Sequence, residues 1–310
     1  MTTGLKDRLG PTRFSNYIDF EQGSSAGIIT GSSIYYVDAS LSSSGNGKSW
    51  NGAFITIAEA VAASLAAGGT YDTIFIKGTE NTGDTSDFAE SVSITAAQTG
   101  LRIIGIGNSP EGVLWTVGTA EGTILTVAAK DVYVAGIRFR PNGATTGKAV
   151  SLASTAIGFT AENCVFRSTV ETALQGIYMD STPDVTISDC KFTSLATGIF
   201  GDASVKTIYR LRVLNCLFDD KVDTAGINIT GRACLIKGND FTSDTVLLID
   251  TYKSSVGEMN IVTGNTLHVA SAYETNCTGT PTDNWLGNFC NDVGSSLVGD
   301  NGITIGIPTS

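Results

Sequence analysis

Two aspartates follow a recurring isoleucine at the same spacing, and their arrangement suggests glycoside chemistry. Asp180 comes three residues after Ile177, and Asp202 comes three residues after Ile199. If these segments stack on adjacent coils, the two backbones lie about 5 Å apart. Carboxyl groups about 5–5.5 Å apart suit a retaining glycosidase, and a separation of about 6.5–9.5 Å suits an inverting one. The sequence therefore predicts a candidate catalytic pair.

The competing interpretation is a series of turn residues that cap backbone amides. Thr230 follows Ile227 by three residues and Asp250 follows Leu247 by three, so the series continues, but Thr230 carries no carboxylate. Capping explains aspartates at turns without any chemistry, and Thr230 favours it. We therefore assign no catalytic residue, and Asp180 and Asp202 are the candidates only if the protein is an enzyme.

A second acidic group lies in turns of variable length. Asp219, Asp220 and Asp223 share one such turn, and Glu171 lies in another. Their oxygens could bind Ca²⁺, although a solvated loop is the simpler interpretation. We predict a surface that contacts a partner or a glycan here, and no metal and no cofactor.

The other residues that could take part in catalysis or ligand binding have mainly structural explanations. The single histidine, His268, has no Ser or Asp pattern around it, and no C-x-x-C occurs, which argues against zinc. Cys277 and Cys290 could form a disulfide. The remaining cysteines are expected to be small apolar core residues. The tryptophans, which could stack on sugars or fill the core, are Trp50, Trp115 and Trp285.

A 26-residue repeat predicts the elements that position these residues. Cys164, Cys190 and Cys216 recur at this step, each two residues before a phenylalanine. Phenylalanine or leucine continues the series at 139, 241 and 267, and Gly-Ile recurs at 176, 198 and 226. A fixed period in this range indicates stacked coils of short strands. The distance from Phe to Gly varies, so residues 167–175, 193–197 and 219–225 form the side where contacts are expected.

Only one segment has helical features. Thr56 and Glu59 match a capping box, an Ala-rich stretch follows, and Gly68-Gly69 ends it, which predicts a helix over 56–67. Strands are expected over 34–38, 73–77, 101–106 and 131–139. The predicted fold is an all-β parallel solenoid, and its parts are an attachment arm (1–33), a β-helix (34–270) and an irregular C-terminal cap (271–310).

Composition limits the partners. The 310 residues carry a net charge of −11, with a pI of about 4.5, which disfavours nucleic acid. No run of about 18 apolar residues occurs, so membrane insertion is not expected. The N-terminus lacks the apolar stretch of a signal peptide, which predicts synthesis in a cytoplasm. Lys6, Arg8 and Arg13 lie in a polar segment that is either a mobile terminus or an arm for particle attachment.

The chain resembles the right-handed parallel β-helix superfamily, which has the pectin-lyase-like fold. The resemblance covers roughly residues 34–270, and the fold hosts lyases, hydrolases, adhesins and spikes. Arg210 and Arg212 flank Leu211 and are expected to point outward, and no Arg/Asp group repeats a pectate-lyase motif. The resemblance is carried by Tyr36-Val37-Asp38-Ala39, by Ser49-Trp50-Asn51-Gly52-Ala53-Phe54, and by the Asn-x-Phe and Gly-Ile repeats.

Within that superfamily the chain looks most like bacteriophage virion proteins. This resemblance implies a homotrimer bound to capsid or tail proteins. Our first hypothesis is a structural or adhesive virion protein, such as a capsid decoration protein, head fibre or spike. This hypothesis favours a protein that is not an enzyme. The alternative is a tailspike depolymerase that cleaves a host surface glycan with Asp180 and Asp202.

Overall fold

The computed structural model divides into two units, residues 1–32 and 33–310. Lys6, Arg8, Arg13, Glu171, Asp202 and Asp220 lie outside the described residues. The structure describes residues 32–79, 87–107, 112–117, 121–142, 147–168, 174–201, 207–219, 222–242, 247–251, 259–269, 272–279, 281–292, 295–298, 302–304 and 306–308.

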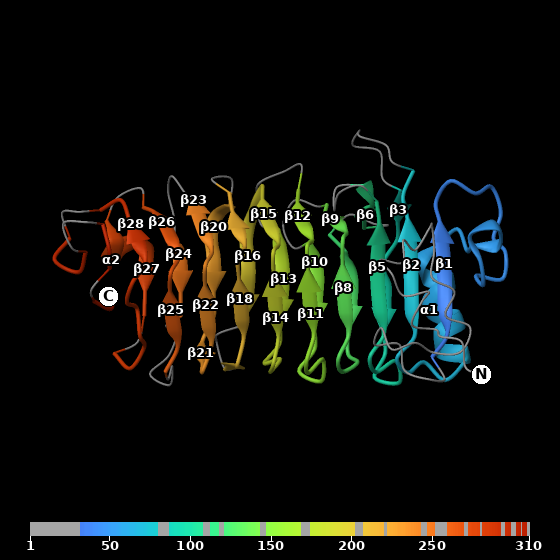
Figure 1. The fold of residues 1–310 in the computed structure, drawn as a ribbon, viewed down its shortest axis with the longest axis horizontal. Coiled ribbons are helices and arrows are strands. Elements are labelled where there is room, and N and C mark those ends of the chain that lie inside the picture. Colours follow the sequence, from blue (N-terminus) through green and yellow to red (C-terminus); the bar gives the residue numbers. More distant parts are fainter. Residues whose placement is uncertain are drawn as a thin grey trace, which may run out of the picture. The chain divides into compact units, whose positions relative to one another are not determined.

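The unit 33–310 is a parallel β-helix in which most coils contribute one strand to each of three sheets (Figure 1). All strand pairs within the three sheets are parallel, and each strand pairs with its equivalents one coil away. Within the described residues, isolated antiparallel bridges occur only near the C-terminal end, between Phe289 and Ile303 and between Val298 and Thr304. The predicted all-β parallel β-helix is therefore confirmed.

The three sheets and one additional pair have the following strands. Sheet A contains β1 (Ile34–Asp38), β2 (Thr73–Lys77), β5 (Arg102–Ile106), β8 (Tyr133–Ala135), β11 (Thr160–Glu162), β14 (Thr186–Ser188), β18 (Arg212–Leu214), β22 (Leu235–Lys237) and β25 (Ile261–Thr263). Sheet B contains β3 (Phe88–Ala89), β6 (Leu114–Thr116), β9 (Arg138–Arg140), β12 (Val165–Arg167), β15 (Lys191–Thr193), β19 (Leu217–Phe218), β23 (Asp240–Thr242), β26 (Thr266–His268) and β28 (Phe289–Cys290). Sheet C contains β4 (Val92–Ile94), β7 (Thr123–Val127), β10 (Lys148–Leu152), β13 (Gln175–Met179), β16 (Leu195–Gly201), β20 (Val222–Asn228), β24 (Leu247–Asp250) and β27 (Cys277–Thr278). The pair is β17 (Ile208–Tyr209) and β21 (Gly231–Arg232).

The repeating phenylalanines form one continuous column inside the coils. Phe166, Phe192 and Phe218 pair in register, and the rings of Phe192 and Phe218 stack at 4.8 Å with an interplanar angle of 5°. Gly198 lies beside this column, where an added Cβ would be 2.8 Å from the Phe218 ring and 2.7 Å from Gly226 O. The Gly-Ile repeat is therefore a packing requirement, because only glycine leaves room for the ring of the next coil.

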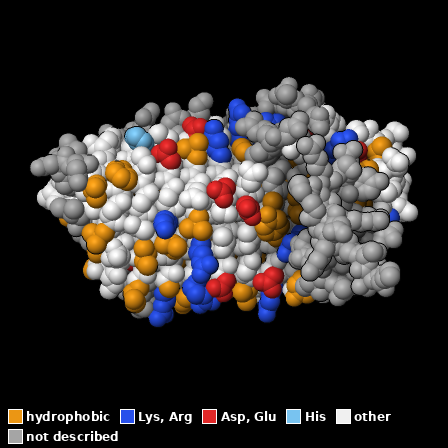
Figure 2. Space-filling view, viewed as in Figure 1, with side chains coloured by type: hydrophobic (Ala, Val, Ile, Leu, Met, Phe, Trp, Pro, Cys, Tyr) orange, Lys and Arg blue, Asp and Glu red, His pale blue; other side chains and the backbone are white. Residues whose placement is uncertain are grey.

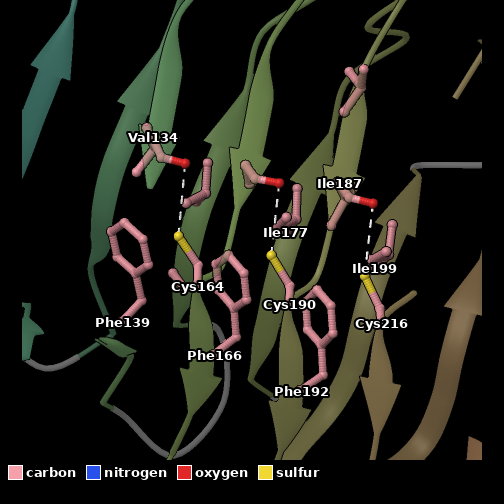
Figure 3. Packing of buried hydrophobic residues seen from close by; sticks show 14 of the residues in the cluster. Val134, Phe139, Cys164, Phe166, Ile177, Ile187, Cys190, Phe192, Ile199 and Cys216 are labelled. Atoms are coloured by element: carbon pink, nitrogen blue, oxygen red, sulfur yellow. Dashed lines mark hydrogen bonds between the residues drawn. The ribbon is translucent and has the colours of Figure 1, made fainter. Parts of the chain in front are cut away.

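The cysteines occupy the turn between sheets A and B. Cys164, Cys190 and Cys216 are buried, and each thiol lies within hydrogen-bonding distance of a carbonyl oxygen in the preceding coil (Figure 3). The residue before each cysteine is Asn or Asp with positive φ, as at Asn163 (φ 49°). These residues tolerate this left-handed conformation, so the repeated Asn/Asp-Cys pair is a turn followed by a core residue.

Asparagines replace the cysteines at the same position in the later coils. Asn239, Asn265 and Asn288 are buried, and each donates a hydrogen bond to a sheet A carbonyl of the preceding coil. Each side chain also bonds to the next, with Nδ2 to Oδ1 distances of 2.9 Å from Asn239 to Asn265 and 2.8 Å from Asn265 to Asn288. The chain thus exchanges an apolar column for an amide column that ties the C-terminal coils together.

The predicted helix is present as α1 (Ile57–Ala66), which packs at the N-terminal end of the solenoid. Both hydrogen bonds of the capping box between Thr56 and Glu59 are formed. Glu90 adds a distant cap, because its carboxylate accepts the N–H groups of Ile57 at 2.7 Å and Ala58 at 3.0 Å. Burial raises the pKa of the Glu90 carboxyl above its ordinary value.

Two further features differ from or extend the expectations. The single strand predicted over 131–139 is two strands, β8 and β9, because Gly136 (φ 67°) turns the chain between them. Beyond residue 270, the short helix α2 (Tyr273–Asn276) leads into β27, and β27 and β28 continue sheets C and B. The remaining helical element is η2 (Trp50–Gly52). None of the helices in the described ranges is long and apolar enough to cross a membrane.

Candidate functional site

The outer face of sheet C carries a row of aromatic and polar side chains that we take as the candidate site. Its members follow one another in register on adjacent strands: Tyr178 pairs with Phe200, Phe200 with Asn228, and Asn228 with Asp250. The flanking residues Ile177, Met179, Ile227 and Ile229 are fully buried, so the intervening side chains point away from the core. We call Tyr178, Phe200, Asn228 and Asp250 the sheet C row.

The two aromatic residues provide a half-exposed apolar surface. The ring centroids of Tyr178 and Phe200 are 6.0 Å apart with an interplanar angle of 28°. Lys148, on the preceding coil, places its Nζ 3.5 Å from the centroid of the Tyr178 ring. This cation–π contact fixes the orientation of the tyrosine. Fixed aromatic rings beside polar groups are the usual means of holding a sugar ring, whose faces are apolar and whose rim is hydroxylated.

The polar end of the row contains an amide with an unused acceptor. Asn228 is 9% exposed and Asp250 is 8% exposed. Asn228 Oδ1 accepts no hydrogen bond from any described residue, and neither does Gln175 Oε1, which lies one coil from Lys148 on the same sheet. An unsatisfied buried acceptor costs about 1–3 kcal/mol.

The sheet C row runs along the solenoid axis and has one side chain per coil, so neighbouring side chains are about 4.8 Å apart at the backbone. This spacing is close to the length of one sugar unit in an extended polysaccharide. Successive sugars can therefore meet successive side chains. The arrangement suits a linear glycan better than a compact small molecule.

The predicted carboxylate series is corrected by the strand register. Ile249, rather than Leu247, is the equivalent of Ile227, so Asp250 aligns with Asn228 and not with Thr230. Asp180 lies two residues after Tyr178, at the end of β13, and is half-buried. Met179 pairs with Gly201, the residue before the undescribed Asp202. Of the predicted pair, only Asp180 can therefore be placed.

The second acidic group does not form a metal site in the part of the chain that is described. Asp219 Oδ2 lies 3.3 Å from Lys191 Nζ, and Asp223 is exposed on β20. Within the described ranges, no group of three or more His, Cys, Asp or Glu residues is placed to hold a metal ion. His268 Nε2 lies 3.8 Å from Asp240 Oδ1 at a half-exposed position.

The other candidates are accounted for by packing. Trp115 and Trp285 are fully buried, and Trp115 begins the phenylalanine column. Trp50 packs edge-on against Tyr36. All six cysteines are free and buried, including Cys277 and Cys290, which form no disulfide. Burial raises the pKa of the Cys190 thiol well above its ordinary value and that of Cys234 to about 11, so neither is a reactive thiolate.

The sheet C row was not among the sites predicted from the sequence, although the sequence contains a signal for it. The residue that follows the recurring Ile is Tyr178, Phe200 or Asn228, and the same position after Ile249 is Asp250. In a strand the residue after a core residue points outward. Two successive aromatic residues at that position indicate an exposed apolar row, which is unusual on a solvated sheet.

Comparison with known proteins gives likeness in fold only. No protein-family model matches the sequence, and no curated protein sequence matches it. Among solved structures, pectin methylesterase PemA from Erwinia chrysanthemi has 16% identity and a TM-score of 0.49, with 79% of this chain and 80% of that chain covered. The pectin methylesterase from Aspergillus niger has 12% identity and a TM-score of 0.49, with 87% and 86% covered. A rhamnogalacturonan lyase has 11% identity and a TM-score of 0.49, with 77% and 69% covered.

These neighbours bear on two predictions. The pectin-lyase-like resemblance is supported at the level of the fold. The inclination against an enzyme is not kept, since it runs counter to the names of these neighbours, which are two pectin methylesterases and a rhamnogalacturonan lyase. Identities of 11–16% transfer no activity to this chain. The bacteriophage, virion and homotrimer predictions rest on the sequence resemblance and stay predictions.

Proposed function

We propose that this protein is a glycan-acting parallel β-helix protein that holds a polysaccharide along the outer face of sheet C. The observation that carries the proposal is the sheet C row, with Tyr178 and Phe200 followed in register by Asn228 and Asp250. The rings of Tyr178 and Phe200, which are half-buried, would pack against sugar faces. Lys148 would keep the Tyr178 ring in place.

The narrower proposal is cleavage of the bound polysaccharide, with Asp180 supplying one carboxyl group. Asp180 lies two residues from Tyr178, so a chain held on the aromatic rings passes close to it. Asp250 lies three strands away along sheet C, about 14 Å at the coil rise. That distance exceeds the separation of a glycosidase pair. The second carboxyl group in this proposal is Asp202, which the sequence predicts and which lies outside the described residues.

Binding tests the first part of the proposal. Titration calorimetry of the full chain against a panel of polysaccharides, including polygalacturonate and neutral dextran, should identify a ligand. Tyr178→Ala should then weaken its binding roughly 5- to 10-fold, because an aromatic contact worth about 1 kcal/mol is lost. Tyr209→Ala is the matched control, since Tyr209 is 38% exposed on β17, outside sheet C. Equal affinities for wild type and Tyr178→Ala would refute the assigned site.

Release of reducing ends or of unsaturated products tests the second part. Wild type should shorten the glycan, whereas Asp180→Asn and Asp202→Asn should bind it with unchanged affinity and cleave it at least 100-fold more slowly, the usual effect of losing an acid–base group. A wild-type rate retained by Asp180→Asn would exclude a catalytic role for Asp180.

A further inference from the structure

The outer face of sheet A has an uneven distribution of charge. Lys237 on β22 and Arg212 on β18 are exposed, and neither forms a hydrogen bond or an ion pair with a described residue. Glu162 on β11 lies on the same face, nearer the N-terminal end, where its Oε2 accepts a hydrogen bond from Tyr133 Oη at 2.8 Å. Between β8 and β25 this face therefore carries a carboxylate at Glu162 and cations at Arg212 and Lys237, in a chain whose net charge is −11, and beyond β8 the next outward side chain in the row of Tyr133 is the exposed Arg102.

Apolar side chains accompany the basic end. Ile261 on β25 is 44% exposed and pairs in register with Leu235, which pairs with Arg212. In Figure 2, Lys and Arg side chains lie among hydrophobic ones over the C-terminal coils. Ile261 and the half-buried Leu235 thus give the basic part of this face an apolar surface beside Arg212 and Lys237.

We propose that the outer face of sheet A between β8 and β25 is a contact surface for a second copy of this chain, related by a two-fold axis. The axis lies in the plane of contact, runs parallel to the strands and passes between β14 and β18. It brings β11 opposite β22 of the second copy and β8 opposite β25. Such a contact is isologous, so every pair of facing residues occurs twice.

The strand register shows why this orientation is complementary. Glu162, Ser188, Leu214 and Lys237 form one row, because each pairs with the next. Glu162 therefore faces Lys237 of the second copy at the same height on the sheet. In the adjacent row, Tyr133 faces Ile261 of the second copy by the same argument. Because the two-fold axis repeats each contact, the dimer would contain two Glu162–Lys237 ion pairs and two Tyr133–Ile261 contacts.

An internal pairing cannot replace this contact. Glu162 and Lys237 are three coils apart within one chain, about 14 Å along the axis, which exceeds the reach of a salt bridge. The surface spans six strands of three residues each, which is small for a stable complex. We therefore expect a dimer with a dissociation constant in the micromolar range, about 1–100 μM, at low salt.

Sedimentation equilibrium of the full chain tests the proposal, with protein concentrations on both sides of that range. Wild type should show the mass of a dimer at low salt and dissociate as salt is added, because ion pairs at a surface are screened. Lys237→Glu and Glu162→Lys should each weaken the dimer at least tenfold, since like charges then face each other twice. The double variant Glu162→Lys/Lys237→Glu should restore the affinity to within about threefold of wild type.

Recovery in the double variant separates a contact from a folding defect, because the two residues do not touch within one chain. Arg167→Glu is the matched control, since Arg167 is an exposed cation on sheet B, and it should leave the dimer unchanged. A monomer at all concentrations, the mass of a trimer, or a double variant no better than the single ones would overturn the proposal. The sheet C row takes no part in this contact, so glycan binding can fail without affecting it.

Discussion

Replacing Asn265 by alanine should destabilise the C-terminal coils more than any change of one exposed side chain. The Asn265 amide is fully buried and connects three coils. Its Nδ2 donates to Ile236 O at 3.1 Å and to Asn288 Oδ1 at 2.8 Å. Its Oδ1 accepts from the N–H and the Nδ2 of Asn239, both at 2.9 Å. Alanine removes all four hydrogen bonds at once.

The magnitude follows from the groups left behind. The Asn239 N–H and the Ile236 carbonyl lose a partner at positions that water does not reach, and each such group costs about 1–3 kcal/mol. The Asn239 amide keeps its hydrogen bonds to the Cys216 N–H and Val213 O, and the Asn288 amide keeps those to the backbone N–H of residue 265, Val262 O and Thr304 Oγ1. We therefore expect a loss of about 3–5 kcal/mol in the free energy of unfolding. Asn265→Cys should lose about half as much, because a thiol can still donate to Ile236 O, as the cysteines of the earlier coils do.

Urea unfolding followed by circular dichroism gives the free energy, and hydrogen exchange locates the loss. Protection should fall in β22 to β28 and remain in β2 to β8, because each repeat contacts only its neighbours. Thr266→Ala, the adjacent residue on the outer side of β26, is the control and should change stability by less than about 0.5 kcal/mol. A loss below about 1 kcal/mol for Asn265→Ala would refute the reasoning, because the amide column would then not hold the coils together.

Two further predictions concern the glycine positions and the corner of the solenoid. Gly198→Ala should lower the free energy of unfolding by about 2–3 kcal/mol in the same urea assay, because the new Cβ would lie 2.7 Å from Gly226 O. Gly112→Ala, whose Cβ meets nothing closer than 3.6 Å, should be nearly neutral, and equal losses would contradict the packing argument. Arg210 Nε donates to Asp184 Oδ1 and Arg210 Nη2 donates to Asp184 Oδ2 at 2.6 Å, and these two hydrogen bonds hold the pKa of the Asp184 carboxyl below its ordinary value. A lowered carboxyl pKa stabilises the fold above the unfolded pKa and loses that contribution as the pH falls, so Asp184→Asn should be less stable than wild type at about pH 7 and equal to it at about pH 2. A difference that persists at low pH would show that the ion pair is not its cause.

The strand register explains which site residues could be found from the sequence. The core column was predictable, because Phe166, Phe192 and Phe218 repeat at one fixed step. The sheet C row follows a variable turn, so its register depends on how each turn closes. That is why the sequence aligned Asp250 with Thr230, whereas the strands pair it with Asn228.

The buried asparagines illustrate the same limit. The motifs around Asn239 and Asn265 were visible as members of the repeat, but an asparagine next to a glycine looks like an ordinary turn residue. Its burial and its bonds to the next coil depend on three coils stacked at about 4.8 Å. The glycan site and the amide column are both properties of neighbouring coils.

The sequence by itself determined the class of fold, the repeat, the inward column and the capped helix α1, since periodicity and capping are local patterns. The tertiary structure decided that Tyr178 and Phe200 stack, that Asn228 retains an unused acceptor, and that Glu162 and Lys237 share a row three coils apart. The physical reason is that residues about 26 positions apart become neighbours only when the coils close. Turns of variable length set which of them meet.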